Sequence, residues 1–359
     1  MRSPLINPFS TIFVGTIFAT LFACNMKTQT NNTTEIREQQ LHKIDSLLQD
    51  AVYAKSMAST LNAAYYKGIG EAVPQFISTT EETDTINVSK KEDKIATNLA
   101  GFYALECGVE LLCDQTKETP VIWLQRITAQ SLDSASNLLL NRFANATWKA
   151  GQPFRGIERI KRSSFIGASH LSNEEVTKDE VQIKNAAVKL LFSMQDVLEA
   201  PTEEQMKYLK KLMQDTSYAK DMAAWMDASY YAGMNEQAPP FLTKEDDTAI
   251  LIKKVKSIKI ATSIAGFYGL ECGLNYLATT TGKLPSEILQ AIVDGELSAE
   301  NEQLLSRFAN ATWKAGQPFI GLQRITREIF TPFYFLSEPD RKKDLMQIKA
   351  AAEKLLKDL

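Results

Sequence analysis

The chain contains few of the residues that most often carry metal or acid–base chemistry. Only two histidines, His42 and His170, occur in 359 residues, which restricts imidazole-based metal binding and histidine catalysis. No Glu-x-x-His pair is present, so a ferritin-like di-metal site is not expected. The sequence also lacks a glycine-rich phosphate loop, a CxxC pair and a nucleophile elbow. We therefore expect no metal and no cofactor, and the chain is more typical of a non-enzymatic protein than of an enzyme.

The net charge is small and cysteines are few. The net charge is −3, whereas general nucleic-acid binding requires a strongly basic face, so no nucleic-acid partner is expected. Of the four cysteines, Cys107, Cys113 and Cys272 lie beyond the N-terminal segment. This odd number does not indicate a closed disulfide framework, and we expect these three residues to be small buried apolar side chains.

One apolar run stands at the N-terminus. It extends from Ile12 to Ala23, follows Arg2, and is too short to cross a bilayer as a helix. The run ends in Leu21-Phe22-Ala23-Cys24, which resembles the lipobox of bacterial lipoproteins. The resemblance covers this segment only. It implies removal of residues 1–23 and lipidation of Cys24, which becomes the new N-terminus.

The residues after Cys24 suit a membrane tether. Asn25 to Thr34 is polar and free of aromatic residues, which is the composition of a flexible linker, and we assign residues 24–36 to this tether. The expected location is the bacterial cell envelope, with the protein facing the periplasm and bound to the lipid bilayer through its N-terminal anchor. An ordinary signal peptide in which Cys24 occurs by chance is the alternative.

The rest of the chain repeats itself. The thirteen residues from Arg142 to Phe154 recur without change from Arg307 to Phe319, at an offset of 165. The same offset aligns Leu105-Glu106-Cys107-Gly108 with Leu270-Glu271-Cys272-Gly273. Chance does not produce such a register, so we infer a domain-sized duplication, with the first copy at 37–198 and the second at 199–359. The counterpart stretches Thr79–Lys90 and Lys244–Val255 have drifted apart, so identity elsewhere indicates a structural or functional demand.

The hydrophobic pattern within each copy predicts helices. Expected helices in the first copy are Glu35–Lys67, Asp93–Cys113, one opening at Pro120, Ser134–Ala150 with Gly151 and Pro153 as stop signals, and Asp179–Phe192. No stretch alternates convincingly with period two. The predicted class is all-α, as two tandem homologous bundles with a pseudo-two-fold relation or as one fused double bundle.

The second of these helices presents a strip of small residues in each copy. Ala100, Ala104 and Gly108 share one face, as do Ala265, Gly269 and Gly273. Small side chains at a spacing of four allow another backbone to approach closely, so we expect a tight helix–helix contact here.

The same helix carries an acidic residue among apolar ones. Glu106 lies between Phe102 and Leu99 on the helical wheel, and Glu271 occupies the counterpart position. A buried carboxylate must find a cation or hydrogen-bond donors, or take up a proton. The leading interpretation is a buried ion pair, and the alternative is a perturbed carboxylate at a binding cleft.

The helix that contains the thirteen-residue repeat supplies cations. Its stripe of Arg142, Asn145 and Lys149 recurs as Arg307, Asn310 and Lys314. Because a guanidinium suits a carboxylate bidentately, we expect Arg142 to pair with Glu106 and Arg307 with Glu271. The reserve partners are Arg159 and Arg324. Should the stripes face a groove instead, they become a candidate site for an anionic ligand or for an acidic patch on a partner.

These observations indicate a lipid-anchored envelope protein that binds a protein or a small ligand, or acts as a scaffold. One alternative is an envelope enzyme that uses Glu106 and Glu271. Another is an immunity-type lipoprotein that caps a toxin.

Overall fold

The computed structural model describes residues 33–44, 85–156, 159–160, 165–215, 250–325 and 330–359, with isolated positions and short runs between 46 and 73 and between 217 and 237. Cys24, the expected signal peptide 1–23 and most of the expected tether 24–36 lie outside the described residues. The class is all-α, as the sequence predicts. A helical segment at 33–44 precedes the labelled helices, which are α3 (Lys90–Asn98), α4 (Ala100–Thr116), α5 (Pro120–Thr128), α6 (Ser134–Arg155), α7 (Asn173–Ser193), α8 (Thr202–Met213), α10 (Val255–Thr281), α11 (Pro285–Asp294), α12 (Ala299–Gly316) and α13 (Glu338–Asp358).

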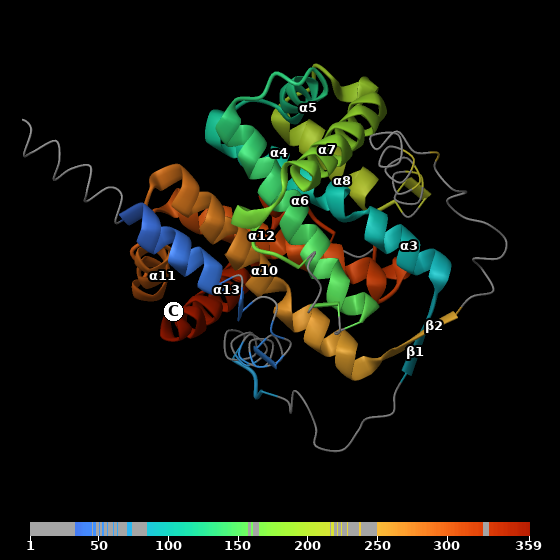
Figure 1. Ribbon diagram of the computed structural model, residues 1–359. Helices are drawn as coiled ribbons and strands as arrows, with labels where there is room; N and C mark the ends of the chain where they lie inside the picture. The colour runs from blue at the N-terminus through green and yellow to red at the C-terminus, as the bar shows by residue number, and fades with distance from the viewer. Residues whose placement is uncertain are drawn as a thin grey trace, which may run out of the picture.

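Four helices form the centre of the molecule. α4 and α6 come from the first half of the chain, α10 and α12 come from the second, and the four pack on one another (Figure 1). α5 and α7 cover α4 and α6, while α11 and α13 cover α10 and α12. The larger of the buried apolar clusters includes residues of both halves, among them Phe143 and Phe308, whose rings stack with centroids 3.9 Å apart. The two halves therefore share one core.

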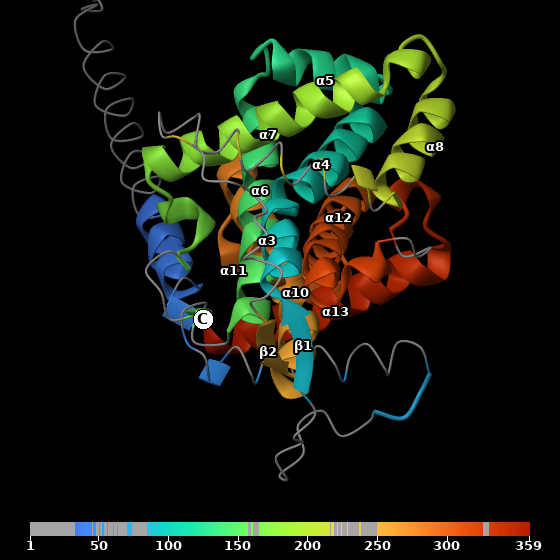
Figure 2. The same cartoon turned by 90° about the vertical axis from the view of Figure 1, so that its right-hand side faces the viewer.

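The described chain also contains two short strands, which the sequence pattern did not predict. β1 (Thr85–Ser89) and β2 (Ile250–Lys254) pair antiparallel, with Asn87 opposite Ile252 at the centre. Figure 2 shows the pair at the end of the bundle opposite α5. Five residues are too few for a clear period of two, and the pairing partner lies in the other half of the chain, so local sequence gave little signal.

Short local motifs set the helix ends. The Asp133 side chain accepts a hydrogen bond from the Ser136 amide and caps α6, and Ser172 forms a capping box with Glu175 at the start of α7. Pro120 stands at the first position of α5, as expected, because its fixed φ suits a first helical turn.

Three expected helices differ from the structure in their bounds. The helix expected from Asp179 begins at Asn173, where the Ser172 capping box starts α7. α6 continues past Gly151 and Pro153 to Arg155, whereas its counterpart α12 ends at Gly316 and is followed by the 3-10 turn η5 (Gln317–Phe319). The rings of Phe154 and Phe319 stack on each other between the halves, which holds this segment by tertiary packing rather than by propensity. The helix expected over Asp93–Cys113 is interrupted at Leu99, which separates α3 from α4, and α4 runs on to Thr116.

The strip of small residues marks a close contact, as predicted. A Cβ atom added at Gly269 would lie 2.9 Å from backbone atoms of Phe308 and Ala309 on α12. Added at Gly108, it would lie 2.5 Å from a methyl carbon of Leu140 on α6. Both distances are shorter than a Cβ atom tolerates. Glycine therefore allows α4 to contact α6 closely and α10 to contact α12 closely, each pair within one half.

The first helix of each half packs on the other half. Gln40, in segment 33–44, accepts a hydrogen bond from the Ser286 amide at the start of α11 (3.0 Å). Gln205, on α8, accepts one from the Val121 amide at the start of α5 (3.0 Å). These contacts are counterparts at the offset of 165, and each satisfies a backbone donor that a helix N-terminus leaves unpaired. Helices of the two halves therefore contact each other at the periphery as well as in the centre.

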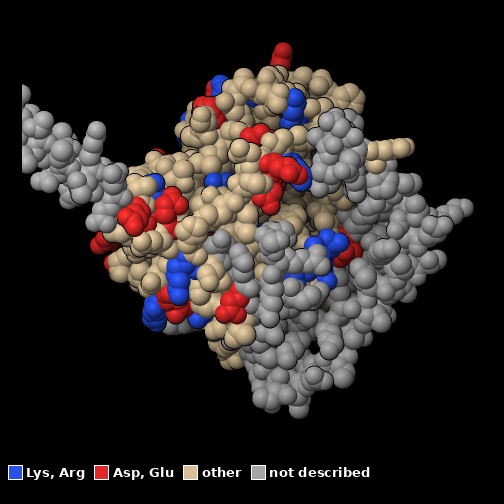
Figure 3. Space-filling model, viewed as in Figure 1, with Lys and Arg blue, Asp and Glu red and all other residues tan. Residues whose placement is uncertain are grey.

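The surface carries both signs of charge. On the face in Figure 3, Lys and Arg side chains alternate with Asp and Glu side chains among the described residues. Within the described part of the chain, no helix combines the length and the apolar character needed to span a bilayer.

Candidate functional site

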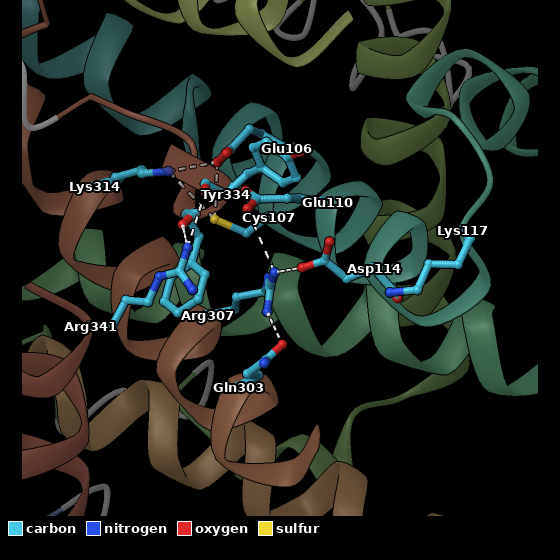
Figure 4. Close-up of polar contacts among 11 residues, drawn as sticks. Glu106, Cys107, Glu110, Asp114, Lys117, Gln303, Arg307, Lys314, Tyr334 and Arg341 are labelled. Atoms are coloured by element: carbon cyan, nitrogen blue, oxygen red, sulfur yellow. Dashed lines mark hydrogen bonds and ion pairs between the residues drawn. The ribbon is translucent and has the colours of Figure 1, made fainter. Parts of the chain in front are cut away.

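Glu106 is buried at the interface between the halves. Its side chain is fully buried on α4, and its Oε2 accepts a hydrogen bond of 2.9 Å from the Lys314 ammonium on α12. The Cys107 thiol donates to the same oxygen (3.0 Å). Lys314 is equally buried, so this ion pair has no access to solvent (Figure 4). The prediction of a sheltered carboxylate with a cationic partner is confirmed at Glu106.

Glu271 forms the counterpart ion pair. Lys149 on α6 donates to its Oε2 (2.8 Å), and the Ala168 backbone N–H donates to its Oε1 (2.8 Å). Burial alone would raise the pKa of Glu271, but the Lys149 ammonium and these hydrogen bonds hold that pKa below its usual value. The carboxylate is therefore ionised at neutral pH.

The predicted Arg–Glu pairs were wrong. Arg142 donates through Nε to Oδ1 of Asn275 (2.6 Å), while Arg307 forms ion pairs with Glu110 (3.7 Å) and Asp114. The stripe on α6 faces α10, and the stripe on α12 faces α4. The lysine and arginine of each stripe therefore contact partners in the other half. Sequence spacing places residues on a helix face but does not identify which neighbouring helix that face meets.

The other predicted residues have separate roles. Asn145 is buried, and its Oδ1 lies 3.6 Å from the Cys272 sulfur across the interface. Asn310 is buried at the counterpart position. Arg159 donates to Gln152 (2.8 Å) and Arg324 donates to Gln317 (2.7 Å), so each reserve candidate contacts a glutamine of its own half.

Three further carboxyl groups that the sequence analysis did not single out surround these pairs. Burial, with the charge of Glu106, raises the pKa of Glu110 to about 8 against the opposing effect of Arg307 and Lys314. Burial likewise raises the pKa of Asp344 to about 8 and that of Asp179 to about 7. These groups hold a proton at pH 6, which reduces the number of negative charges near the buried lysine–glutamate pairs.

The raised pKa values predict that the folded state loses stability as pH rises. A carboxyl group whose pKa is higher in the folded state than in the unfolded state stabilises most below the unfolded value, and this contribution is lost as pH rises through the folded value. We expect the free energy of unfolding to fall by a few kcal/mol between pH 5 and pH 8, because Glu110 ionises in the unfolded chain over this range while burial beside Glu106 keeps it protonated in the folded state. Urea unfolding at several pH values measures this slope.

The variant Glu110→Gln tests the origin of that slope. We expect a shallower decline and higher stability than the wild type at pH 8, since the amide keeps its shape and does not ionise. Asp344 and Asp179 remain and leave part of the slope. The control is Glu174→Gln, which removes an exposed carboxylate whose pKa is lowered by a hydrogen bond from Lys178. An unchanged slope in Glu110→Gln would contradict the assignment.

Burial restricts the chemistry that these networks support. A nucleophile or general base must reach its substrate, yet Glu106, Lys149 and Lys314 have fully buried side chains. Burial also raises the pKa of the Cys107 thiol well above its usual value, and Glu106 adds to this shift, so the thiol stays protonated. The arrangement is suited to holding the halves together.

Position 110 shows why one partner escaped the sequence analysis. Glu110 and Asn275 occupy counterpart positions, and both contact the arginine of the opposite stripe. The residue differs between the halves, so identity at the offset of 165 did not mark it. A signal was available in the spacing, because Glu110 lies one helical turn after Glu106 on the same face.

Comparison of the chain with protein-family models, with curated proteins and with solved structures gives no match. The two buried ion-pair networks indicate that the repeated polar residues stabilise the molecule.

Proposed function

We propose that this chain is a lipid-anchored protein of the bacterial cell envelope whose helical unit binds or scaffolds a partner without catalysis. The anchor is Cys24, and residues 24–36 act as a tether that separates the helical unit from the bilayer. The lipobox-like Leu21-Phe22-Ala23-Cys24 and the polar segment that follows it support this assignment.

We further propose that the helical unit is a tandem duplication with a pseudo-two-fold axis, assembled as one fused double bundle. Residues on such an axis contact their own counterparts. Phe143 stacks on Phe308, and Phe154 stacks on Phe319, each pair being 165 positions apart. Asn87 lies opposite Ile252, again 165 positions apart, at the centre of the strand pair. Three contacts between a residue and its own counterpart favour a pseudo-two-fold axis over a chance similarity of two sequences.

The observation that carries the non-enzymatic proposal is the burial of both lysine–glutamate pairs between the halves. Glu106 and Lys149 are then the same residue types as their counterparts because both ion pairs are needed to assemble one core. An unpaired buried charge would cost several kcal/mol. This accounts for the residues that a catalytic or ligand-binding proposal would otherwise claim. The outer surface is left for a partner, which is either a protein or a small ligand.

The alternatives require other surfaces. An envelope enzyme built on Glu106 and Glu271 would need substrate to enter a sealed interface. An immunity-type protein that caps a toxin would use the exterior, and for this reason it remains a special case of the binding proposal.

Lipidation is tested by metabolic labelling with an alkynyl fatty acid in a bacterial host. We expect labelled, membrane-associated protein, and we expect globomycin to block its maturation. The variant Cys24→Ala should be unlabelled and released from the membrane. Equal membrane association of the variant and the wild type, without label in either, would reject the anchor.

The non-enzymatic role is tested with a variant that removes the buried pair as a unit. Glu106→Leu combined with Lys314→Met should preserve the fold, since replacing both partners by apolar residues is often neutral. Cross-linking of the anchored protein in cells, followed by mass spectrometry, should give the same partners for the wild type and for this variant. Loss of those partners from a folded variant would place the buried pair in a functional site.

A further inference from the structure

The two histidines of the chain meet in the structure although they are 128 positions apart. His42 lies in the helical segment 33–44, and His170 lies in the 3-10 turn η2 (Ala168–His170). Their Nε2 atoms are 3.3 Å apart. Glu38 lies one helical turn before His42, and one donor atom from each of the three side chains falls within 4.8 Å of the others. Residues 38, 42 and 170 are therefore a cluster of metal-ligand types outside the buried networks.

Both backbones that carry the cluster are held in place. In segment 33–44, Ile44 is buried in the shared core and Gln40 forms two hydrogen bonds with Ser286 at the start of α11. In η2, the Ala168 amide donates to Glu271 of a buried ion pair. The meeting of the two rings thus follows from fixed elements, whereas the rings themselves reach the surface.

The spacing of the nitrogen atoms suits a tetrahedral metal ion. With Zn–N bonds of about 2.0–2.1 Å, two tetrahedral nitrogen ligands lie about 3.3 Å apart. The Nε2 atoms are separated by 3.3 Å. The rings are stacked with an interplanar angle of 28°, so the exposed His42 ring has to turn about its χ2 for both lone pairs to meet one ion.

A neighbouring hydroxyl can set the tautomer of His170. Ser169 Oγ lies 3.1 Å from His170 Nδ1. When Nδ1–H donates to this oxygen, the Nε2 lone pair is directed away from it and is available to a metal ion. Ligating histidines commonly hold their second ring nitrogen in this way.

We propose that Glu38, His42 and His170 form a Zn²⁺ site. Two imidazole nitrogens and one carboxylate oxygen supply three ligands, and water fills the fourth position, which a partner's side chain can replace. The ion joins the first helix of the helical unit to η2 and closes a long stretch of chain. It therefore favours the folded state.

The second half provides an internal comparison. The counterparts of Glu38, His42 and His170 are Glu203, Lys207 and Phe335. There Lys207 forms an ion pair with Glu203 (2.7 Å), so the positive charge beside the glutamate comes from a lysine side chain of the protein itself. The first half has side chains of metal-ligand type at the same three positions. Exchanging these residues for their counterparts gives variants that the fold already accommodates in the other half.

The test is Zn²⁺ binding by the untagged full chain, measured by calorimetry, with Co²⁺ as the spectroscopic probe. We expect a Zn²⁺ ion that raises the melting temperature and visible d–d bands of tetrahedral Co²⁺. His42→Lys and His170→Phe, which copy the second half, should each weaken binding tenfold or more, since even a second-shell change costs about 10–100-fold. Glu174→Gln is the matched surface control and should bind as the wild type does.

The reciprocal graft tests sufficiency. Lys207→His combined with Phe335→His, with Glu203 left in place, should add a second equivalent of Zn²⁺. Zn²⁺ binding that survives both His42→Lys and His170→Phe, or a wild-type chain that binds no Zn²⁺, would overturn the site. A folded graft without a second equivalent would also overturn it, because the three side chains would then not define a site.

Discussion

Replacing Lys314 with methionine is expected to lower the free energy of unfolding by about 3–5 kcal/mol. The Lys314 and Glu106 side chains are both fully buried, and their ion pair spans the two halves. Methionine fills a similar volume but leaves the Glu106 carboxylate without a cation, beside Glu110. Urea unfolding monitored by circular dichroism measures the change.

Three variants separate loss of the pair from loss of packing. Adding Glu106→Leu to Lys314→Met should restore most of the stability, since no charge then remains buried alone. Lys149→Met should cost less than Lys314→Met, because Glu271 keeps its hydrogen bond from the Ala168 amide. Lys178→Met, which breaks an exposed pair on α7, should change stability by less than about 1 kcal/mol. A small effect of Lys314→Met would contradict the role of the pair.

The first half alone, residues 37–198, is expected not to fold as a monomer. It would lack Lys314 and Arg307, and it would expose Phe143 and Phe154, which stack on residues of the second half. Two copies could satisfy one another, with Lys149 of one copy pairing with Glu106 of the other. The expected products are a two-fold homodimer or an aggregate, and light scattering after size exclusion distinguishes them from a monomer.

Co-expression supplies the control for this experiment. The fragments 37–198 and 199–359 produced together should form a one-to-one complex with the helical content of the intact chain. Within a homodimer of the first fragment, Lys149→Met should abolish assembly. A monomeric 37–198 that unfolds cooperatively would show that each half has a sufficient core of its own.

Much of the secondary structure could be predicted from the sequence, because its signals are local. The helices expected to open at Pro120 and at Ser134 begin at these residues as α5 and α6. The small-residue strip containing Gly108 and Gly269 predicted close helix contacts that the packing confirms. The strands could not be predicted, since five residues paired with a distant segment leave no local period.

The ion pairs were predicted only in part. That Glu106 must be sheltered and paired followed from its place on an apolar helix face. The choice of Lys314 over Arg142 depends on which helix the stripe meets, and this is a long-range property. The histidine cluster was missed for a related reason. Identity at the offset of 165 highlighted the repeated residues, whereas His42 and His170 have no histidine at the corresponding positions 207 and 335.

The sequence alone contains the residues repeated at an offset of 165, the pattern that predicts the helical class and the lipobox-like Leu21-Phe22-Ala23-Cys24. Each of these is encoded by residues close together in the chain or by direct repetition of letters. Only the tertiary structure decided that the halves exchange their charged partners and that two distant histidines meet. The physical reason is that burial and pairing are set by which faces contact in space, and a carboxylate without water takes the cation that the neighbouring helix brings to it.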